Sequence, residues 1–486
     1  MGQFGPPAPL ATALPARYSG LMHDLLLIDG GLVPGATLAP VINPATGAIL
    51  CHAPRADARQ AEQAIAAARR AAPGWAATPV EQRGQALHAL AQALEQHTAA
   101  IARLLTQEQG KTLAEAQGEV EGSVAALRYH AALRLSPRIF RSSAQELVVE
   151  QRYPLGVVAA LVPWNYPLLM LVLKLAPALI AGNAVIAKPA PSTPLATLML
   201  GALAADLFPA GVVQVLAESG EIGPLLVAHR HIDHVSLTGS TATGRKVLTG
   251  AATTLKRFTL ELGGNDAAIV LDDADIGAIA QDLFIGATAN AGQVCLGIKR
   301  IYVARRKADD LCDALAALTR QAVAGDGLDP ASTLGPVQNA AQQARLHGLI
   351  AEARGLGRVV AEGEAPGQGF FIPPMVIRDL PETARLVSEE QFGPVIPVLP
   401  YDDLEDAIAR ANASDHALGG SVWSGDAQRA LAVAARLRTG LVWVNRVFDL
   451  PFDVPLGGAR QSGMGRHQGI EGVEEFTQTR IVNARL

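Results

Sequence analysis

The stretch that decides the fold is "GVVAALVPWNYPLLMLVLKLAPALIAGNAVIAKPA", residues 156–190. Two aliphatic runs, "GVVAALV" and "NAVIA", flank a loop with Pro and Asn and a long apolar segment that carries Lys174. Parallel strands buried on both faces read as unbroken aliphatic runs, and the connection between two of them is usually a helix. We therefore expect a strand, a loop, a buried helix and a second parallel strand.

The same alternation continues downstream to about Thr259. Strand-like "VVQVLA" and "HIDHVSLTG" alternate with helix-like "STPLATLMLGALAADLF", "EIGPLLVAH" and "TATGRKVLTGAATT". After "FTLELGGNDAAIVL" a second alternation begins, with "RIYVAR" and "VIPVLPY" as strands. This order predicts the α/β class, with a doubly wound, mostly parallel sheet and a second α/β domain.

Upstream of this stretch, "LLLIDGGLVPG" and "APVINPATGAILC" read as short strands. From Asp57 apolar residues recur at helical spacing, and "PVEQRGQALHALAQALEQHTAAIARLLTQEQG" reads as one helix that begins at Pro79. A further helix is expected from Lys111 to Ala132. The C-terminal "EEFTQTRIVNARL" is either an edge strand or a tail, and residues 1–20 are expected to be a loose arm.

The net charge limits the classes of partner that we expect, and the cysteine content indicates the cellular compartment. The net charge of −5 argues against a nucleic-acid groove or an anionic membrane surface, so a small molecule is the expected partner. The three cysteines lack a CxxC motif, which predicts no disulfide framework, no thiolate metal site and a cytoplasmic location. The uncharged run Leu155 to Leu173 could span a bilayer by length, but Pro163, Asn165 and Pro167 interrupt it and favour a strand, a loop and a buried helix.

Three successive strand ends carry groups that suit a ligand. Asn165 in "VPWNYP" could donate to an oxyanion, or could bond its own backbone in a turn. Lys188 in "KPAPSTP" could reach a ribose or a phosphate, or could be solvated surface. In "LTGSTATGRK" a helix begins just after Gly239, and its free N–H groups could hold a pyrophosphate, although such turns also occur without a nucleotide.

Two further residues could carry the chemistry. Glu261 closes an apolar strand in "LELGGND", where burial would raise its pKa and make it a base, although it could equally cap the Gly-Gly turn. Cys295 in "TANAGQVCLGIKR" follows a helix, and N–H dipoles or the cations Lys299 and Arg300 would lower its pKa. Most lone cysteines in apolar surroundings are inert, and we read Cys51 and Cys312 as packing.

These segments, in this order and spacing, resemble the aldehyde dehydrogenase superfamily of the NAD(P)-dependent, hydrolytic type over nearly the whole chain. The motifs are "INPATG", "PWNYP", "KPA", "LTGSTATG", "LELGG", "GQVC", "EEQFGPV", "PLGGARQSGMGR" and "FTQT". The resemblance implies a Rossmann-like cofactor domain, a second, catalytic α/β domain and a small β oligomerisation arm. It assigns residues 21–135 and 153–260 to NAD(P) binding, 261–465 to catalysis, and 136–152 with 466–486 to the oligomerisation segment of a homodimer or homotetramer.

The resemblance also implies the roles of the site residues. Cys295 would be the nucleophile that forms a thiohemiacetal and a thioester with an aldehyde, and Asn165 with the Cys295 N–H would bind the oxyanion. Glu261 would activate the hydrolytic water, Lys174 would belong to a proton relay, and no metal is implied. The implied cofactor-binding residues are Pro163, Trp164, Lys188, Gly220, Gly239, Ser240, Gly244, Glu390 and Phe392.

Three positions depart from the family pattern. Pro191 stands where NAD-specific members often have a ribose-binding Glu, so either NAD or NADP is expected as cofactor. His467 replaces a Glu that is common in "GRE" and could shuttle protons or be structural. Asn265 replaces a usual Lys, with no effect that the sequence reveals.

The sequence says less about the substrate than about the reaction. Residues that match the access tunnel predict an apolar aldehyde: Tyr166, Met170, Leu173, Leu296 and Leu450. Arg446 could instead pair with a substrate carboxylate and make the chain a semialdehyde dehydrogenase. A CoA-acylating enzyme would not need Glu261, a thiol hydrolase would not need the cofactor segments, and a non-catalytic binding protein would not need Cys295, Glu261 and Asn165 together.

Overall fold

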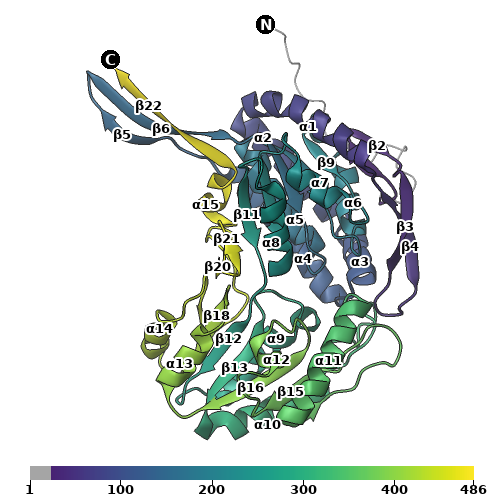
Figure 1. The fold of residues 1–486 in the computed structure, drawn as a ribbon, viewed down its shortest axis with the longest axis vertical. Coiled ribbons are helices and arrows are strands. Elements are labelled where there is room, and N and C mark those ends of the chain that lie inside the picture. The colour runs from purple at the N-terminus through teal and green to yellow at the C-terminus, as the bar shows by residue number, and fades with distance from the viewer. Residues whose placement is uncertain (1–22) are drawn as a thin grey trace.

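The computed structural model describes residues 23–486, so the predicted loose arm at residues 1–20 lies outside the described residues. The chain forms two lobes and a projecting arm (Figure 1). We call the part built on an eight-stranded sheet the first lobe, and the part built on a seven-stranded sheet the second lobe. The mixed α/β architecture with parallel-strand sheets confirms the predicted fold class.

The first sheet contains the stretch that decides the fold, and that stretch folds as predicted. Strand β7 (Val157–Leu161) leads through a loop into helix α5 (Pro167–Ala181) and then into the parallel strand β8 (Ala184–Lys188). The sheet order is β2-β1-β9-β8-β7-β10-β11-β21. The remaining strands are β1 (Leu26–Ile28), β2 (Gly31–Val33), β9 (Val213–Val215), β10 (His234–Thr238), β11 (Arg257–Glu261) and β21 (Gly463–Met464). Strands β7 to β11 run parallel, so their carboxyl ends share one edge.

Helices cover this sheet, and one prediction about them is wrong. The helices are α1 (Ala58–Ala77), α2 (Val80–Gln96), α3 (Thr98–Gln109), α4 (Leu113–Ala132), α6 (Leu195–Ala204), α7 (Ile222–Ala228) and α8 (Thr241–Ala251). The segment expected as one helix from Pro79 is divided at His97 into α2 and α3. His97 Nδ1 lies 2.8 Å from the Ala93 oxygen, and the Thr98 hydroxyl donates to the Glu95 oxygen at 2.8 Å. These side-chain bonds compete with the helical backbone bonds.

The second sheet has the order β14-β15-β16-β13-β12-β18-β19, and only the β14–β15 pair is antiparallel. Its strands are β12 (Asp266–Val270), β13 (Ile298–Ala304), β14 (Arg358–Glu362), β15 (Met375–Arg378), β16 (Val395–Tyr401), β18 (Gly420–Trp423) and β19 (Trp443–Val444). Its helices are α9 (Ile276–Thr288), α10 (Arg305–Gln321), α11 (Ala340–Leu356), α12 (Arg385–Ser388), α13 (Leu404–Asn412) and α14 (Ala427–Ala434). The predicted strands "RIYVAR" and "VIPVLPY" lie within β13 and β16.

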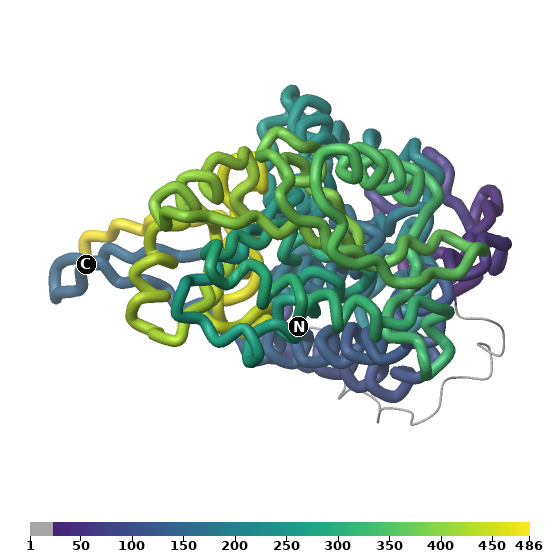
Figure 2. The backbone as a smooth tube through the Cα atoms, turned by 90° about the horizontal axis from the view of Figure 1, so that it is seen from below, coloured from purple at the N-terminus to yellow at the C-terminus, as the bar shows by residue number. Residues whose placement is uncertain are grey.

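A three-stranded antiparallel sheet forms the arm, which projects from the body in both views (Figures 1 and 2). It consists of β5 (Arg138–Ser142), β6 (Glu146–Pro154) and β22 (Thr477–Arg485), in the order β22-β6-β5. The C-terminal segment is therefore an edge strand, the first of its two predicted forms. Smaller elements are β3 (Thr37–Ile42) with β4 (Ile49–Arg55), β17 (His416–Ala417) with β20 (Ala459–Arg460), and α15 (Gly469–Glu474).

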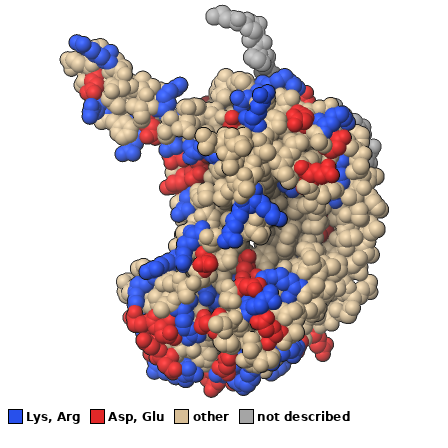
Figure 3. Space-filling model, in the orientation of Figure 1, with Lys and Arg blue, Asp and Glu red and all other residues tan. Residues whose placement is uncertain are grey.

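Two further features of the fold are the character of its helices and the shape and charge of its surface. Within residues 23–486, none of the helices combines the length and the apolar character that a membrane crossing requires. Acidic and basic side chains are mixed over the visible face, and the surface is hollowed between the two lobes (Figure 3). This hollow lies at the edge where the parallel strands of the first sheet end.

Candidate active site

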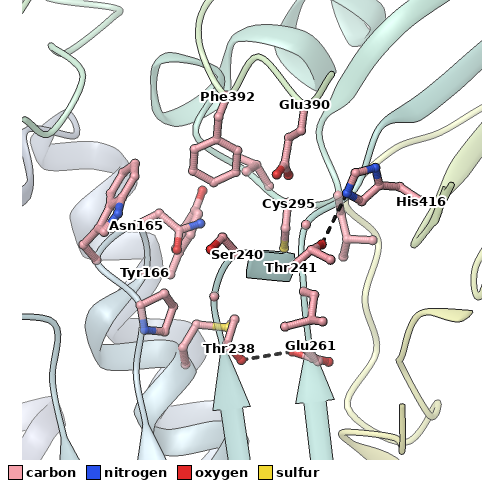
Figure 4. A pocket seen from close by; sticks show the side chains of 18 of the residues that line it. Asn165, Tyr166, Thr238, Ser240, Thr241, Glu261, Cys295, Glu390, Phe392 and His416 are labelled. Atoms are coloured by element: carbon pink, nitrogen blue, oxygen red, sulfur yellow. Dashed lines mark hydrogen bonds between the residues drawn. The ribbon is translucent and has the colours of Figure 1, made fainter. Parts of the chain in front are cut away.

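A cavity of about 850 Å³ brings together residues from both lobes. Nine of the predicted site residues line it: Pro163, Trp164, Asn165, Gly239, Ser240, Glu261, Cys295, Glu390 and Phe392. In the close view Glu261 and Thr238 lie at strand ends below Cys295, whereas Glu390 and Phe392 lie above it (Figure 4). The predicted residues Lys174, Lys188, Gly220 and Gly244 are not among the residues that line this cavity.

The loop before Cys295 has an unusual backbone. Asn290 and Ala291 have φ of +50° and +53°, and Gly292 follows with φ of +74°. A side chain at Gly292 would collide with the backbone of Gly393, so this position needs glycine. Left-handed conformations at residues other than glycine are costly and are held here by surrounding contacts, such as the 2.6 Å bond from the Asn290 N–H to Glu115 Oε1. The loop carries Cys295, which is half-buried, to the cavity wall.

Asn165 bonds to this loop and not to its own turn. Its side-chain Nδ2 donates to the Gln293 oxygen at 2.9 Å. Its backbone oxygen accepts bonds from Lys111 Nζ at 2.9 Å and from Asn290 Nδ2 at 3.0 Å. The interpretation of Asn165 as a self-capping turn residue is therefore wrong, because its amide links the β7–α5 loop to the loop that carries Cys295.

Lys111 and Glu119 support the Asn165 turn, and no motif in the sequence indicates them. Both side chains have 0% exposure, and Lys111 Nζ lies 2.5 Å from Glu119 Oε2. Glu119 Oε1 accepts bonds from the N–H groups of Leu168 and Leu169 at the start of α5. Lys111 Nζ also lies 3.6 Å from the centre of the Tyr166 ring. An amphipathic pattern cannot show a pair of charges that face each other inside the core.

Glu261 has a depressed pKa, which corrects the prediction that burial would raise it. Burial alone would raise the pKa, but His467, Lys174 and Thr238 together hold it below its usual value. His467 Nδ1 lies 2.9 Å from Glu261 Oε2, and the Thr238 hydroxyl donates to the same oxygen at 3.5 Å (Figure 4). Glu261 Oε1 makes no hydrogen bond with any residue that the structure describes. Glu261 is thus an anion near neutral pH with one free oxygen.

The pKa of Cys295 is raised to about 12, whereas the sequence predicted that it would be lowered. The causes are burial and the carboxylates of Glu261, Glu390 and Asp266, which outweigh the effect of Lys299. The ammonium group of Lys299 is bonded to the Val294 oxygen at 2.6 Å and to the Gly297 oxygen at 3.1 Å.

The guanidinium of Arg300 also bonds to backbone oxygens, of Asn265 at 2.9 Å and of Ala411 at 3.2 Å. Cys295 is therefore a neutral thiol before any ligand binds. The two other cysteines lie in β4 and α10, as expected for packing residues, and Cys312 is buried.

Lys174 lies behind the cavity wall and next to Glu261. Its side chain has 0% exposure and donates to the hydroxyls of Thr238 at 2.7 Å and Ser236 at 3.3 Å. Burial lowers the pKa of Lys174 to about 8, against the opposite effect of Glu261 and Cys295. Its Nζ lies 3.5 Å from His467 Nε2, so Glu261, His467 and Lys174 form one buried chain of contacts.

The opposite part of the cavity has features that suit a dinucleotide. Helix α8 begins at the cavity, where the Ser240 hydroxyl caps it by accepting a bond from the Thr243 N–H at 3.2 Å. Trp164 and Phe392 meet edge to face at 5.5 Å between ring centres. A helix N-terminus suits a pyrophosphate, and the flat ring of Phe392 suits a nicotinamide, so these residues fit the implied cofactor.

The segment that carries Glu390 and Phe392 is held by helix α11, through residues that sequence reasoning missed. Gln342 Nε2 donates to the oxygens of Gln391 and Phe392, both at 2.9 Å, and Arg345 donates to the Glu390 oxygen at 2.9 Å. Phe392 has φ of +55°.

Glu390 Oε1 accepts the Gly264 N–H at 2.9 Å, and Asn265 Nδ2 donates to the Val387 oxygen at 2.9 Å. Asn265 therefore joins two backbone segments. His416 also lines the cavity, with Nε2 3.4 Å from the Thr241 hydroxyl, and no motif in the sequence indicated it (Figure 4).

Three predicted cofactor-binding residues, Lys188, Gly220 and Gly244, lie outside the cavity lining. Lys188 Nζ lies 3.0 Å from Glu218 Oε1, and the Gly220 N–H donates to the same carboxylate. Gly220 has φ of +126°, which favours glycine. A Cβ on Gly244 would lie 2.7 Å from Leu262 Cδ1, so Gly244 allows α8 to pack closely on that residue.

The third part of the cavity is apolar. All five predicted tunnel residues line it, and four further apolar residues join them: Leu169, Phe448, Phe452 and Leu456. Arg446 is absent from this lining; its side chain is 62% exposed and pairs with Asp449. The wall therefore suits an uncharged, apolar chain.

Comparison with known proteins agrees with this geometry. A sequence model described as the aldehyde dehydrogenase family matches residues 33–482. The chain belongs to the aldehyde dehydrogenase family. The betaine aldehyde dehydrogenase of Rhizobium leguminosarum bv. trifolii is 36% identical over 468 residues, which cover 94% of this chain and 96% of that protein.

Two solved structures extend the similarity to the fold. The betaine aldehyde dehydrogenase of Staphylococcus aureus, solved with NAD+, has a TM-score of 0.92 and 32% identity, covering 95% of this chain and 94% of that one. An NADP-dependent enzyme of E. coli has a TM-score of 0.93 and 33% identity, covering 96% of this chain and 99% of that one. This aldehyde dehydrogenase thus resembles enzymes described with either dinucleotide.

Proposed function

We propose that this aldehyde dehydrogenase oxidises an apolar aldehyde to its carboxylic acid with NAD or NADP, through a thioester on Cys295 that Glu261 helps to hydrolyse. The main support is that Cys295, Asn165 and Glu261, from three separate parts of the chain, line one cavity. A nucleophile, an oxyanion donor and a base are the three groups that this reaction needs.

The first half of the reaction forms the carbon–sulfur bond. Because the pKa of Cys295 is about 12 before any ligand binds, the thiol must lose its proton to a base as it attacks the carbonyl carbon. Glu261 is an anion with a free Oε1 and can take this proton. The Asn165 amide and the Cys295 N–H would then stabilise the negative oxygen of the thiohemiacetal.

The second half releases the acid. A bound dinucleotide would supply the hydride acceptor that turns the thiohemiacetal into the thioester. Glu261 must first pass on the proton that it took from Cys295. Lys174, which is connected to Glu261 through Thr238 and has a pKa of about 8, would release one of its own protons and accept this one in its place. The ionised Glu261 would then take a proton from a water molecule, whose oxygen attacks the carbonyl of the thioester and displaces the Cys295 sulfur, which is reprotonated.

The cofactor would lie between the two lobes. Gly239, Ser240 and Trp164 would hold the phosphates, Glu390 and Phe392 would hold the nicotinamide riboside, and Lys188 with Gly220 would lie near the adenosine. Pro191 has no carboxylate to repel a 2′-phosphate, and Arg55 Nη2 donates to the Pro191 oxygen at 2.9 Å. Both features support use of NADP as well as NAD.

The substrate would be a neutral, apolar aldehyde. Apolar and aromatic side chains predominate in the access tunnel, although Gln468 is also among the residues that line the cavity. Arg446 pairs with Asp449 outside this lining. The presence of Glu261 at the cavity speaks against transfer of the acyl group to CoA, and the cofactor-type residues speak against a simple thiol hydrolase or a non-catalytic binding protein.

The domain organisation would follow the two lobes, except that β21 pairs with β11 in the first sheet. Residues 21–135 and 153–260 would bind the dinucleotide, and residues 261–465 would form the catalytic domain. Residues 136–152 and 466–486 would join subunits of a homodimer or homotetramer. The exposed apolar side chains of Ile139 and Ile481 on the arm support this role. Three free cysteines support a cytoplasmic location.

The experiment is an absorbance assay of a panel of aliphatic and aromatic aldehydes with NAD and with NADP. The wild-type enzyme should form NADH or NADPH with apolar aldehydes, and the Cys295→Ala variant should form neither. If no aldehyde in the panel is oxidised, or if Cys295→Ala retains the activity, the proposal is wrong.

A further inference from the structure

His467 contacts Glu261, and none of the reaction steps described above uses it. It has 1% exposure and is fixed by two backbone bonds to Leu456, of 2.7 and 2.8 Å, which place it behind the tunnel wall. Helix α15 covers it closely, since a Cβ on Gly472 would lie 2.8 Å from the His467 carbonyl carbon. The imidazole is therefore held by its backbone and packing, independently of any ligand.

The two nitrogens of the His467 ring contact groups of opposite charge, a carboxylate and an ammonium group. Nδ1 lies 2.9 Å from Glu261 Oε2, whereas Nε2 lies 3.5 Å from Lys174 Nζ and 3.5 Å from the Ser236 hydroxyl. A neutral ring with its proton on Nδ1 leaves Nε2 free to accept from Lys174 or Ser236. His467 Nδ1 makes no hydrogen bond with any residue that the structure describes, so its 2.9 Å contact with Glu261 Oε2 is mainly electrostatic.

The surrounding charges favour this protonation state. The groups that influence His467 come from several elements: Lys174 on α5, Glu261 on β11, Glu475 after α15, His130 on α4 and His234 on β10. Burial lowers the pKa of His467, and Lys174 lowers it further, against the opposite effects of Glu261 and Glu475. Burial also lowers the pKa of His130 to about 4 and that of His234 to about 3, so neither is a cation near neutral pH.

We propose that His467 is a positioning residue that keeps Glu261 ionised and oriented for hydrolysis of the thioester, by fixing Oε2 and leaving Oε1 free. This inference rests on the proposed role of Glu261 as the base. Without His467, Glu261 would be a buried carboxylate near only Lys174 and the weakly placed Thr238 hydroxyl. Burial would then dominate, and Glu261 would be protonated, and inactive as a base, at a higher pH.

The test compares His467→Phe, which removes the contact, with His467→Gln, whose amide can still donate to Glu261. The readout is the pH dependence of p-nitrophenyl acetate hydrolysis without cofactor, which needs only the thiol and the base. For His467→Phe we expect the acidic limb of this profile to move to higher pH by about one unit, as the loss of a charge-stabilising partner predicts. His467→Gln should restore much of the original position.

Two controls separate the possible failures. His130→Phe makes the same change at a buried histidine whose ring is bonded to the Ala126 oxygen, and it should leave the acidic limb in place. If His467→Phe lowers the rate without moving the limb, His467 is only structural and this inference is wrong. If instead Glu261→Gln retains the wild-type limb, Glu261 is not the base, and the proposed function itself fails.

Discussion

Asn165 Nδ2 donates a 2.9 Å hydrogen bond to the backbone oxygen of Gln293, which lies just before Cys295. The proposed oxyanion donor is thus tied to the loop that carries Cys295, the proposed nucleophile, although the two residues come from different lobes. Because an amide nitrogen carries two hydrogens, the bond to Gln293 leaves one for a substrate oxygen. The position of the proposed oxyanion site therefore depends on how the two lobes pack.

Replacement of Asn165 by Ala should lower kcat for aldehyde oxidation by about 10²–10³-fold, the usual cost of losing one oxyanion donor. The KM for the dinucleotide should change little, because the side chain bonds to the Cys295 loop and not to the cofactor segments. Steady-state kinetics with NAD measures both values. A kcat close to that of the wild type would show that Asn165 does not bind the oxyanion.

The buried Lys111–Glu119 pair predicts a large effect on stability. Lys111→Met leaves the Glu119 carboxylate buried without its partner, which should cost about 3–5 kcal/mol. The double variant Lys111→Met, Glu119→Leu removes both charges and should recover part of the stability. Denaturation followed by circular dichroism compares the three proteins. Equal stability of the wild type and Lys111→Met would contradict the buried pair.

Alkylation of Cys295 by iodoacetamide should report its raised pKa. With a pKa of about 12, the thiol stays protonated through neutral and mildly alkaline pH, so the rate should keep rising with pH in the enzyme without cofactor. Glu390→Gln removes a charge that raises this pKa and should speed the reaction at fixed pH. Mass spectrometry of the Cys295 peptide measures the rate. A plateau near neutral pH would contradict the raised pKa.

Much of the fold could be predicted because its signals are local. The aliphatic runs of β7 and β8 indicate strands that are buried on both faces. The "GQVC" motif around Cys295 is one of the motifs that resemble the aldehyde dehydrogenase superfamily. The break at His97 was missed, since side-chain bonds to the backbone compete with a helical pattern that continues through it. The pKa directions of Cys295 and Glu261 were also missed, because Glu390 and His467, which help to set them, come from distant segments.

Pro191 should control the choice of cofactor. Pro191→Glu places a carboxylate where it would repel a 2′-phosphate, so kcat/KM with NADP should fall by about tenfold or more relative to NAD, which corresponds to about 1.4 kcal/mol. Pro191→Ala is the matched control and should keep the wild-type ratio. The prediction fails if the wild-type enzyme shows no activity with saturating NADP, or if Pro191→Glu leaves the ratio unchanged.

The most direct test of the mechanism is intact-protein mass spectrometry of Glu261→Gln after mixing with an apolar aldehyde and NAD. Glu261→Gln lacks the base for both steps, so at alkaline pH, where part of the Cys295 thiol ionises without a base, it should still form the thioester, though slowly. Because the variant also lacks the base that activates water, the acyl group should accumulate, and peptide mapping should locate it on Cys295. The double variant Cys295→Ala, Glu261→Gln should carry no such mass. An acyl group on another residue, or rapid turnover by Glu261→Gln with no acyl-enzyme, would contradict the assignment of Cys295 as nucleophile and Glu261 as base.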